Sequence, residues 1–162
     1  MLDTFTVAFF GHREIEYFQE TEQALEKLIE SLMREHEYVE FLIGRNGEFD
    51  QLTASTVRSV RNRLGCRNSS FTLVLPYMTA EFRDNEESFL AYYDEIEVCQ
   101  TSDGTHFKAA IQTRNRTMTE RADLVVFCVD HHSGGAYQTL KYVKAKQIPY
   151  INISEKGNSM GL

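Results

Sequence analysis

The stretch FTVAFF at residues 5–10 is followed directly by Gly11, His12 and Arg13, and this junction decides the fold. Its side chains are apolar at both odd and even positions, which is typical of a strand buried on both faces in a parallel sheet. Four further short runs share this pattern and are rich in β-branched and aromatic residues: 38–43 (YVEFLI), 71–75 (FTLVL), 124–129 (LVVFCV) and 150–153 (YINI).

Helical hydrophobic periods separate most of these runs. Stripes of apolar residues at helical spacing begin near Leu25, Leu52, Phe107 and Ala136. Strands that alternate with helices predict a three-layer α/β fold with right-handed crossovers. We expect a Rossmann-like, mainly parallel five-stranded sheet in the order 3-2-1-4-5, whose switch point lies between strands 1 and 4.

Residues 77–105 form a connection that is too long to lack structure of its own. Within it, residues 86–93 are compatible with a short helix, and residues 95–99 (EIEVC) with an extra or edge strand. The whole stretch is equally compatible with a lid, and the sequence does not choose between these interpretations.

Composition places the chain among ordinary globular proteins. Its 162 residues are 42% hydrophobic and 25% charged, and we expect one domain over residues 1–162 with a flexible tail at 153–162. The formal net charge of −7 argues against a general polyanion binder, because nucleic-acid affinity comes largely from basic side chains. We therefore do not expect nucleic acid as a partner, although a local pocket for one small anion fits the composition.

Cysteine usage and the first residues bear on location. The chain has three cysteines and no CxxC pair, which indicates neither a disulfide framework nor a zinc knuckle and favours a reducing compartment. The first apolar run is too short for a signal sequence or a membrane span. We expect a cytoplasmic protein without a membrane partner.

Glycine-rich and polar turns follow three of the expected strands, at the sheet edge where open α/β folds bind ligands. They contain these candidate ligand-binding residues: Gly11, His12 and Arg13; Gly44, Gly47 and Asp50; Ser133, Gly134 and Gly135. Glycine lets backbone approach a ligand, and a helix N-terminus beyond the turn attracts phosphate. Packing alone also explains such turns, and Asp50 is equally suited to capping the second helix.

Two adjacent histidines after strand 4 raise the question of a metal. His131 and His132 stand beside Asp130. Adjacent side chains rarely face one ion, and no third ligand is spaced to help. We expect neither a metal nor another cofactor.

The helix that begins near Phe107 carries a charge on its apolar stripe. Arg114 falls between Ile111 and Met118 on that stripe, and Asn115 lies beside it. A buried guanidinium needs a partner, and phosphate or carboxylate suits it. The alternatives to a ligand are an ion pair with a carboxylate such as Asp123, or a side chain that extends to the surface.

Several short motifs resemble the SLOG superfamily, a Rossmann-like group that includes the lonely-guy (LOG) phosphoribohydrolases, the DprA proteins and a YpsA-like branch. The motifs occur in matching order and cover most of the chain: 7–13 (VAFFGHR), 43–50 (IGRNGEFD), 75–77 (LPY), 93–96 (YDEI), 113–118 (TRNRTM), 121–127 (RADLVVF), 133–135 (SGG) and 148–153 (IPYINI). The resemblance implies a nucleotide-type ligand.

Compared with the LOG enzymes, this chain matches one of their two functional residues and lacks the other. Those enzymes use an arginine, matched here by Arg114, and a glutamate in a PGGxGTxxE loop. The corresponding stretch 133–139 (SGGAYQT) has no proline and no glutamate, with Tyr137 or Gln138 near the glutamate position. Neither side chain is a carboxylate that can serve an oxocarbenium-like centre.

Three functions follow as hypotheses. The leading one is a module that binds a nucleotide or nucleotide-derived small molecule through the glycine turns, Arg114 and Asn115. The alternative is an enzyme, a nucleoside 5′-monophosphate N-glycosidase or a deoxyribosyltransferase-like protein, in which Asp50 (or Glu48) supplies the carboxylate and Arg114 orients phosphate. The third, a DprA-like nucleic-acid module, is not expected from the acidic balance. By analogy with related folds, we expect self-association into a dimer.

Overall fold

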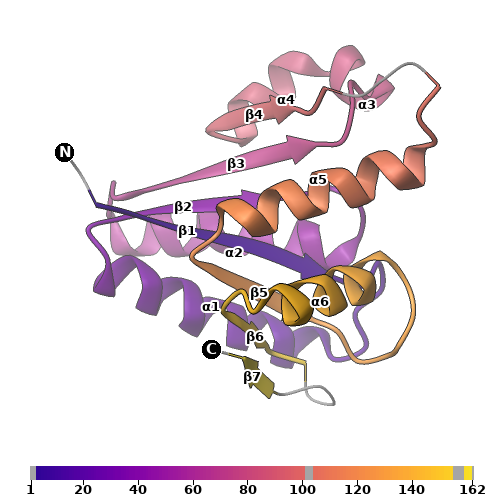
Figure 1. The fold of residues 1–162 in the computed structure, drawn as a ribbon. Helices are drawn as coiled ribbons and strands as arrows, with labels where there is room; N and C mark the ends of the chain where they lie inside the picture. The colour runs from indigo at the N-terminus through magenta and orange to yellow at the C-terminus, as the bar shows by residue number, and fades with distance from the viewer. Residues whose placement is uncertain (1–2, 101–103, 155–158, 162) are drawn as a thin grey trace.

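The computed structural model describes residues 3–100, 104–154 and 159–161, which form one sheet with helices on both faces (Figure 1). The strands are β1 (Thr4–Gly11), β2 (Tyr38–Ile43), β3 (Ser69–Leu75), β4 (Glu95–Val98), β5 (Leu124–Cys128), β6 (Tyr150–Asn152) and β7 (Ser159–Gly161). The helices are α1 (Phe18–Glu35), α2 (Glu48–Leu64), α3 (Ala80–Asp84), α4 (Glu86–Tyr92), α5 (Phe107–Arg121) and α6 (Gly135–Lys146).

The sheet order is β4-β3-β2-β1-β5-β6-β7, in which β7 is antiparallel to β6 and the other neighbours are parallel. The five predicted strands are present in the predicted order, but the expected strand count is wrong. The strand β4 extends the parallel sheet beyond β3, and β7 pairs with β6 at the opposite edge. Both are short edge strands, and β4 (EIEV) alternates charged and apolar residues, so neither has the apolar run of a central strand.

The connection that the sequence left open and the expected tail both contain described elements. The connection 77–105 contains α3, α4 and β4, while residues 101–103 lie outside the described part. Residues 153–162, expected as a tail, contain β7, and residues 155–158 and 162 lie outside the described part. No helix in the described ranges is long and apolar enough to cross a membrane.

Alternate residues of each central strand build two separate cores. On β1, Val7 and Phe9 belong to the cluster that α1 and α2 cover, whereas Ala8 and Phe10 belong to the cluster that α5 and α6 cover. All four are buried, which explains why the run at 5–10 is apolar throughout. Figure 1 shows the two helical layers on either side of the sheet.

The switch point lies between β1 and β5, which are the first and fourth predicted strands, as expected. Strand β1 pairs with β2 on one side and with β5 on the other. From β2 the following strands continue toward one edge of the sheet, and from β5 they continue toward the opposite edge. The turns after β1, β2 and β5 therefore diverge around a crevice at the carboxyl ends of the strands. This crevice is where ligands bind in open α/β folds, and it positions the site described next.

Candidate functional site

A cavity of about 340 Å³ lies at this switch point. Its lining includes these residues that the sequence singled out: Gly11, His12, Arg13, Gly44, Asp50, Arg114, Asn115, Gly134 and Gly135. Two other candidates, Gly47 and Ser133, are not among the lining residues. The turns after three strands and one face of α5 thus meet around one space.

The side chain of Arg114 is buried at this cavity, with 2% of the residue exposed. Its Nε donates to Oδ1 of Asn115 at 2.8 Å, and its Nη1 donates to the carbonyl of Val74 at 2.8 Å. Burial lowers the pKa of Arg114, and Asp50 and Cys99 oppose that shift. The guanidinium therefore has neutral hydrogen-bond acceptors, and within the described residues it makes no ion pair.

The two alternatives for Arg114 do not occur. Its burial shows that the side chain does not extend to the surface. The carboxylate of Asp123 instead accepts a hydrogen bond from the backbone N–H of Thr6 at 2.8 Å, which joins the start of β5 to β1.

Asp50 lies inside the first turn of α2 and is not its N-cap, so the capping alternative is wrong. The helix begins at Glu48, with Gly47 at the cap position. The carboxylate of Asp50 accepts a hydrogen bond from the backbone N–H of Asn46 at 2.8 Å, just before the helix. Burial raises the pKa of Asp50, and the Asn46 hydrogen bond and Arg114 oppose that shift.

The other carboxylate considered, that of Glu48, is not part of the cavity lining. It accepts a hydrogen bond from the backbone N–H of Ile15 at 3.2 Å. Gly47 also has a packing role, because a Cβ there would lie 2.4 Å from Cα of Arg13. These two residues hold the turn after β1 against the turn after β2.

The N-terminus of α6 forms another part of the cavity wall. Gly134 has a φ of 91°, which favours glycine, and no side chain caps the helix that starts at Gly135. The free backbone N–H groups of a first helical turn carry partial positive charge. Asn115 donates to Oγ1 of Thr139 at 3.0 Å and so fixes α6 to α5 beside Arg114.

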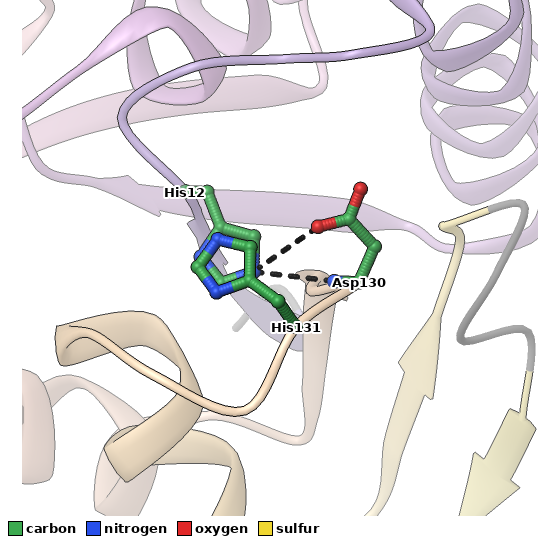
Figure 2. Close-up of side chains that lie close together, drawn as sticks. All are labelled: His12, Asp130 and His131. Carbon is green, nitrogen blue, oxygen red and sulfur yellow. Dashed lines mark hydrogen bonds and ion pairs between the residues drawn. The ribbon is translucent and has the colours of Figure 1, made fainter.

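His12 and His131 stack at the rim of the cavity, next to Asp130 (Figure 2). Their ring centroids are 3.5 Å apart and the rings are inclined by 10°. Nε2 of His12 accepts a hydrogen bond from the backbone N–H of Asp130 at 3.2 Å and lies 3.5 Å from its Oδ1. Burial, followed by His131, lowers the pKa of His12, while Asp130 raises it.

The three side chains are close enough to suggest a metal site, with His12 as the third member that the sequence did not reveal. An imidazole binds metal in its own ring plane, at roughly 2.0–2.1 Å for zinc. Nearly parallel rings 3.5 Å apart share no such point. The stacked arrangement is therefore unsuited to ligation by both rings, and His132 stacks on Tyr137 instead.

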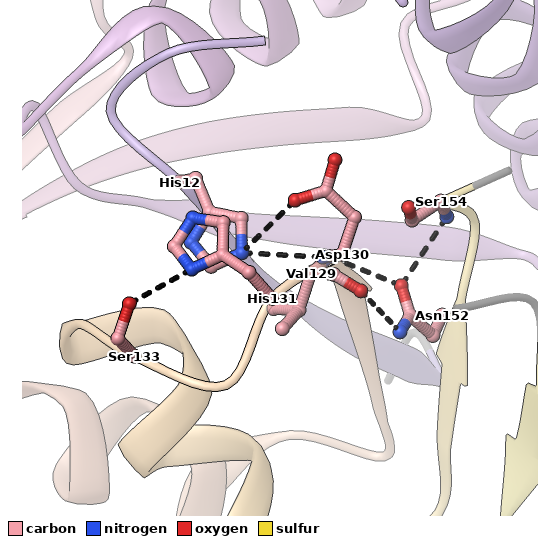
Figure 3. Close-up of polar contacts among 7 residues, drawn as sticks. All are labelled: His12, Val129, Asp130, His131, Ser133, Asn152 and Ser154. Atoms are coloured by element: carbon pink, nitrogen blue, oxygen red, sulfur yellow. Dashed lines mark hydrogen bonds and ion pairs between the residues drawn. The ribbon is translucent and has the colours of Figure 1, made fainter. Parts of the chain in front are cut away.

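Asn152 on β6 supports the backbone that leads into this rim (Figure 3). Its amide donates to the carbonyl of Val129 at 2.9 Å and accepts from the N–H of Val129 at 3.1 Å and of Ser154 at 3.2 Å.

Ser133, which the sequence assigned to ligand binding, contacts Nδ1 of His131 through its hydroxyl at 2.9 Å. Asn152 thus holds the backbone just before Asp130 in place, while Ser133 contacts His131 at the rim of the cavity.

Comparisons with known proteins identify the fold. No protein-family model and no curated protein matches the sequence. DNA processing protein A (DprA) from Streptococcus pneumoniae superposes with a TM-score of 0.67 at 13% identity, over 92% of this chain and 50% of that one. DprA from Helicobacter pylori, in a structure described as showing its single-stranded DNA binding mode, gives 0.63 at 14% identity, over 91% and 64%.

This likeness corrects one expectation and confirms another. The chain spans half of the first DprA chain and less than two thirds of the second. The expectation that nucleic acid is not a partner is overturned, because a protein of the same fold is described as binding single-stranded DNA. The expectation rested on the net charge of the whole chain, which does not determine the electrostatic potential in one cleft. The fold of this chain is that of the DprA proteins, as the resemblance to the SLOG superfamily predicted.

Proposed function

We propose that the cavity binds a nucleotide unit through its phosphate, either as a free nucleotide or as part of single-stranded DNA. The observation that carries the proposal is the buried guanidinium of Arg114, which has only neutral hydrogen-bond partners. Burying a cation costs free energy unless an anion pairs with it, and the nearby carboxyl group of Asp50 opposes the lowering of the pKa of Arg114 by burial without forming an ion pair with it. A phosphate in the cavity would supply that anion and would also meet the uncapped N-terminus of α6.

The second polar feature favours a nucleotide over inorganic phosphate. Asp50 lines the same cavity beside Arg114, and its oxygens can accept a hydrogen bond from a group that lies next to the phosphate of the ligand. It suits a hydroxyl group, such as that of a sugar carried next to the phosphate. The volume of about 340 Å³ falls within the roughly 300–1,000 Å³ of small-molecule sites.

The test measures stabilisation by four probes: inorganic phosphate, AMP, dTMP and a short oligothymidylate. A bound probe at a hundredfold excess over its Kd should raise the free energy of unfolding by roughly 2.7 kcal/mol. Binding of a mononucleotide identifies the free ligand, whereas binding of the oligonucleotide alone identifies single-stranded DNA. Stabilisation by none of them, or by phosphate alone, overturns the proposal.

Two variants connect the binding to the cavity. Arg114→Met removes the buried charge and should abolish stabilisation by every probe. Arg83→Met is the matched control, because its side chain is 66% exposed on α3 and does not line the cavity. Equal binding by both variants would show that Arg114 does not hold the phosphate, and circular dichroism would verify that both fold.

Cleavage of the N-glycosidic bond is a second candidate, favoured by the raised pKa of Asp50 inside the cavity. A carboxyl group with a raised pKa is suited to proton transfer at the reacting centre. Release of free base from nucleoside 5′-monophosphates tests this activity, and Asp50→Asn should abolish the release while the nucleotide still binds. Undiminished release by Asp50→Asn would exclude Asp50 from that role.

A further inference from the structure

A second cavity, of about 370 Å³, lies against the same turn that borders the first. Gly44 and Asn46 line the first cavity, whereas Arg45 between them lines the second. Neighbouring residues at the start of α2 also line different cavities, because Asp50 lines the first cavity and Gln51 lines the second. The two cavities are therefore neighbours, with one turn and one helical turn as their common wall.

The guanidinium of Arg45 is held in a fixed position in the second cavity. Its Nε and Nη2 donate to Oε1 of Glu81 at 3.0 and 2.8 Å, and its Nη1 donates to the hydroxyl of Tyr93 at 3.1 Å. Its central carbon lies 4.8 Å from the ring centroid of Phe89. Three hydrogen bonds and an aromatic ring thus pre-organise a flat cation at the wall of this cavity.

The remaining lining combines one half-buried aromatic ring with exposed polar groups, whereas the rings of Phe89 and Tyr93 are buried. Tyr92 is half-buried, and the guanidinium of Arg58 lies 4.3 Å from its ring centroid. Gln51 and Ser88 are exposed and offer donors and acceptors. Guanidinium planes and aromatic rings are the surfaces on which proteins stack unpaired bases, and neighbouring amide groups contact base edges.

We propose that the second cavity binds the base of a second nucleotide, adjacent to the nucleotide held in the first cavity. The chain would then recognise two consecutive nucleotides of a single strand. This inference rests on the proposed function, because the first nucleotide places its neighbour over the common wall. The occupant it names is a base and not a phosphate, since Arg45 already pairs with the carboxylate of Glu81.

The experiment compares the affinities of three ligands by calorimetry: thymidine 5′-monophosphate, its 5′-phosphorylated dinucleotide, and the same dinucleotide with an abasic second sugar. The second base should increase affinity roughly 5- to 150-fold, as one stacked base does. The abasic ligand should lose that gain although it keeps both phosphates.

Two variants assign the gain to the second cavity. Gln51→Ala changes an exposed side chain, and Arg45→Met removes the flat cation. Both should reduce the gain from the second base and leave the affinity for the mononucleotide unchanged. Unfolding curves verify that each variant folds.

The outcomes separate this inference from the proposed function. A mononucleotide that binds without any gain from the second base overturns the inference alone, as does a gain that the abasic ligand or both variants retain. Failure of every ligand to bind removes the proposed function and the inference with it.

Discussion

Asp50 and Arg114 approach each other across the backbone of Gly44, although their helices cover opposite faces of the sheet. A Cβ atom on Gly44 would lie 3.2 Å from Oδ2 of Asp50 and 3.0 Å from Nη1 of Arg114. A side chain at position 44 would therefore force the two charged groups outward. Because Gly44 has no side chain, Asp50 from α2 and Arg114 from α5 can line the same cavity at the end of β2.

Asp50→Asn should stabilise the protein at neutral pH. Because burial raises the pKa of Asp50, the unfolded chain ionises this group first, and the folded state loses stability as the pH rises through the folded-state pKa. Asparagine keeps the shape and an acceptor for the N–H of Asn46 without the charge. We expect a gain of roughly 0.5–2 kcal/mol in the free energy of unfolding at pH 7. Urea denaturation at pH 7 and pH 4 measures the gain, which should shrink at pH 4; a variant less stable than the wild type at pH 7 contradicts the assignment.

Gly11→Ala should destabilise the protein strongly. A Cβ there would lie 2.3 Å from Cγ of Phe49, whose ring is fully buried in the core and has no room to move. Overpacking of this kind costs roughly 1–3 kcal/mol in the free energy of unfolding. Gly135→Ala is the matched control, since its Cβ would lie 3.6 Å from Nε2 of Gln112, an ordinary contact. Chemical denaturation compares the two, and equal stabilities would refute the packing argument.

Lowering the pH should reduce the stability of the protein, because His12 takes up a proton more readily in the unfolded chain than in the folded one. Its pKa is lowered from 6.5 in the folded state, so the unfolded chain binds the proton first as the pH falls below that value. The contribution is complete above pH 6.5 and is lost as the pH falls through the folded-state pKa. His12→Gln should flatten the stability curve between pH 7 and pH 5, as measured by urea denaturation across that range. Parallel curves for the wild type and His12→Gln would contradict this linkage.

Asn152→Ala should weaken the backbone that leads into the turn after β5. The substitution leaves the N–H and the carbonyl of Val129 without their side-chain partner in a buried position. An unsatisfied buried polar group costs about 1–3 kcal/mol, so the loss in the free energy of unfolding should be at least of this size. Asn85→Ala, which removes one exposed hydrogen bond to the carbonyl of Glu81, is the control. Similar losses for both variants, measured by denaturation, would show that Asn152 has no special supporting role.

The central sheet could be predicted from the sequence because strands buried on both faces leave continuous apolar runs. The runs around Phe9, Phe41 and Val126 share this property, and their order was predicted as that of a Rossmann-like sheet. The edge strands β4 (EIEV) and β7 (SMG) lack such a run, so residues 95–99 could be named only as a possible edge strand and β7 was not predicted. The convergence of Gly11, Gly44 and Gly134 followed from the same order, because the carboxyl ends of neighbouring parallel strands lie together.

Side-chain arrangements between distant elements could not be predicted in this way. The His12 ring reaches His131 only because Gly11 pairs with Cys128 in the sheet register. The position of Asp50 depended on where α2 begins, and helix starts are read from sequence only to within a few residues. The second cavity depends on α4 packing beside α2, and the sequence left the conformation of that segment open.

The turn between β2 and α2 acts as a partition, because consecutive residues of it belong to two compartments. If a ligand in one cavity moves this turn, the turn also moves in the wall of the other cavity, because Asn46 and Arg45 are adjacent residues. Binding at the two cavities would then be coupled, and thermodynamic reciprocity would require each ligand to change the affinity of the other by the same factor.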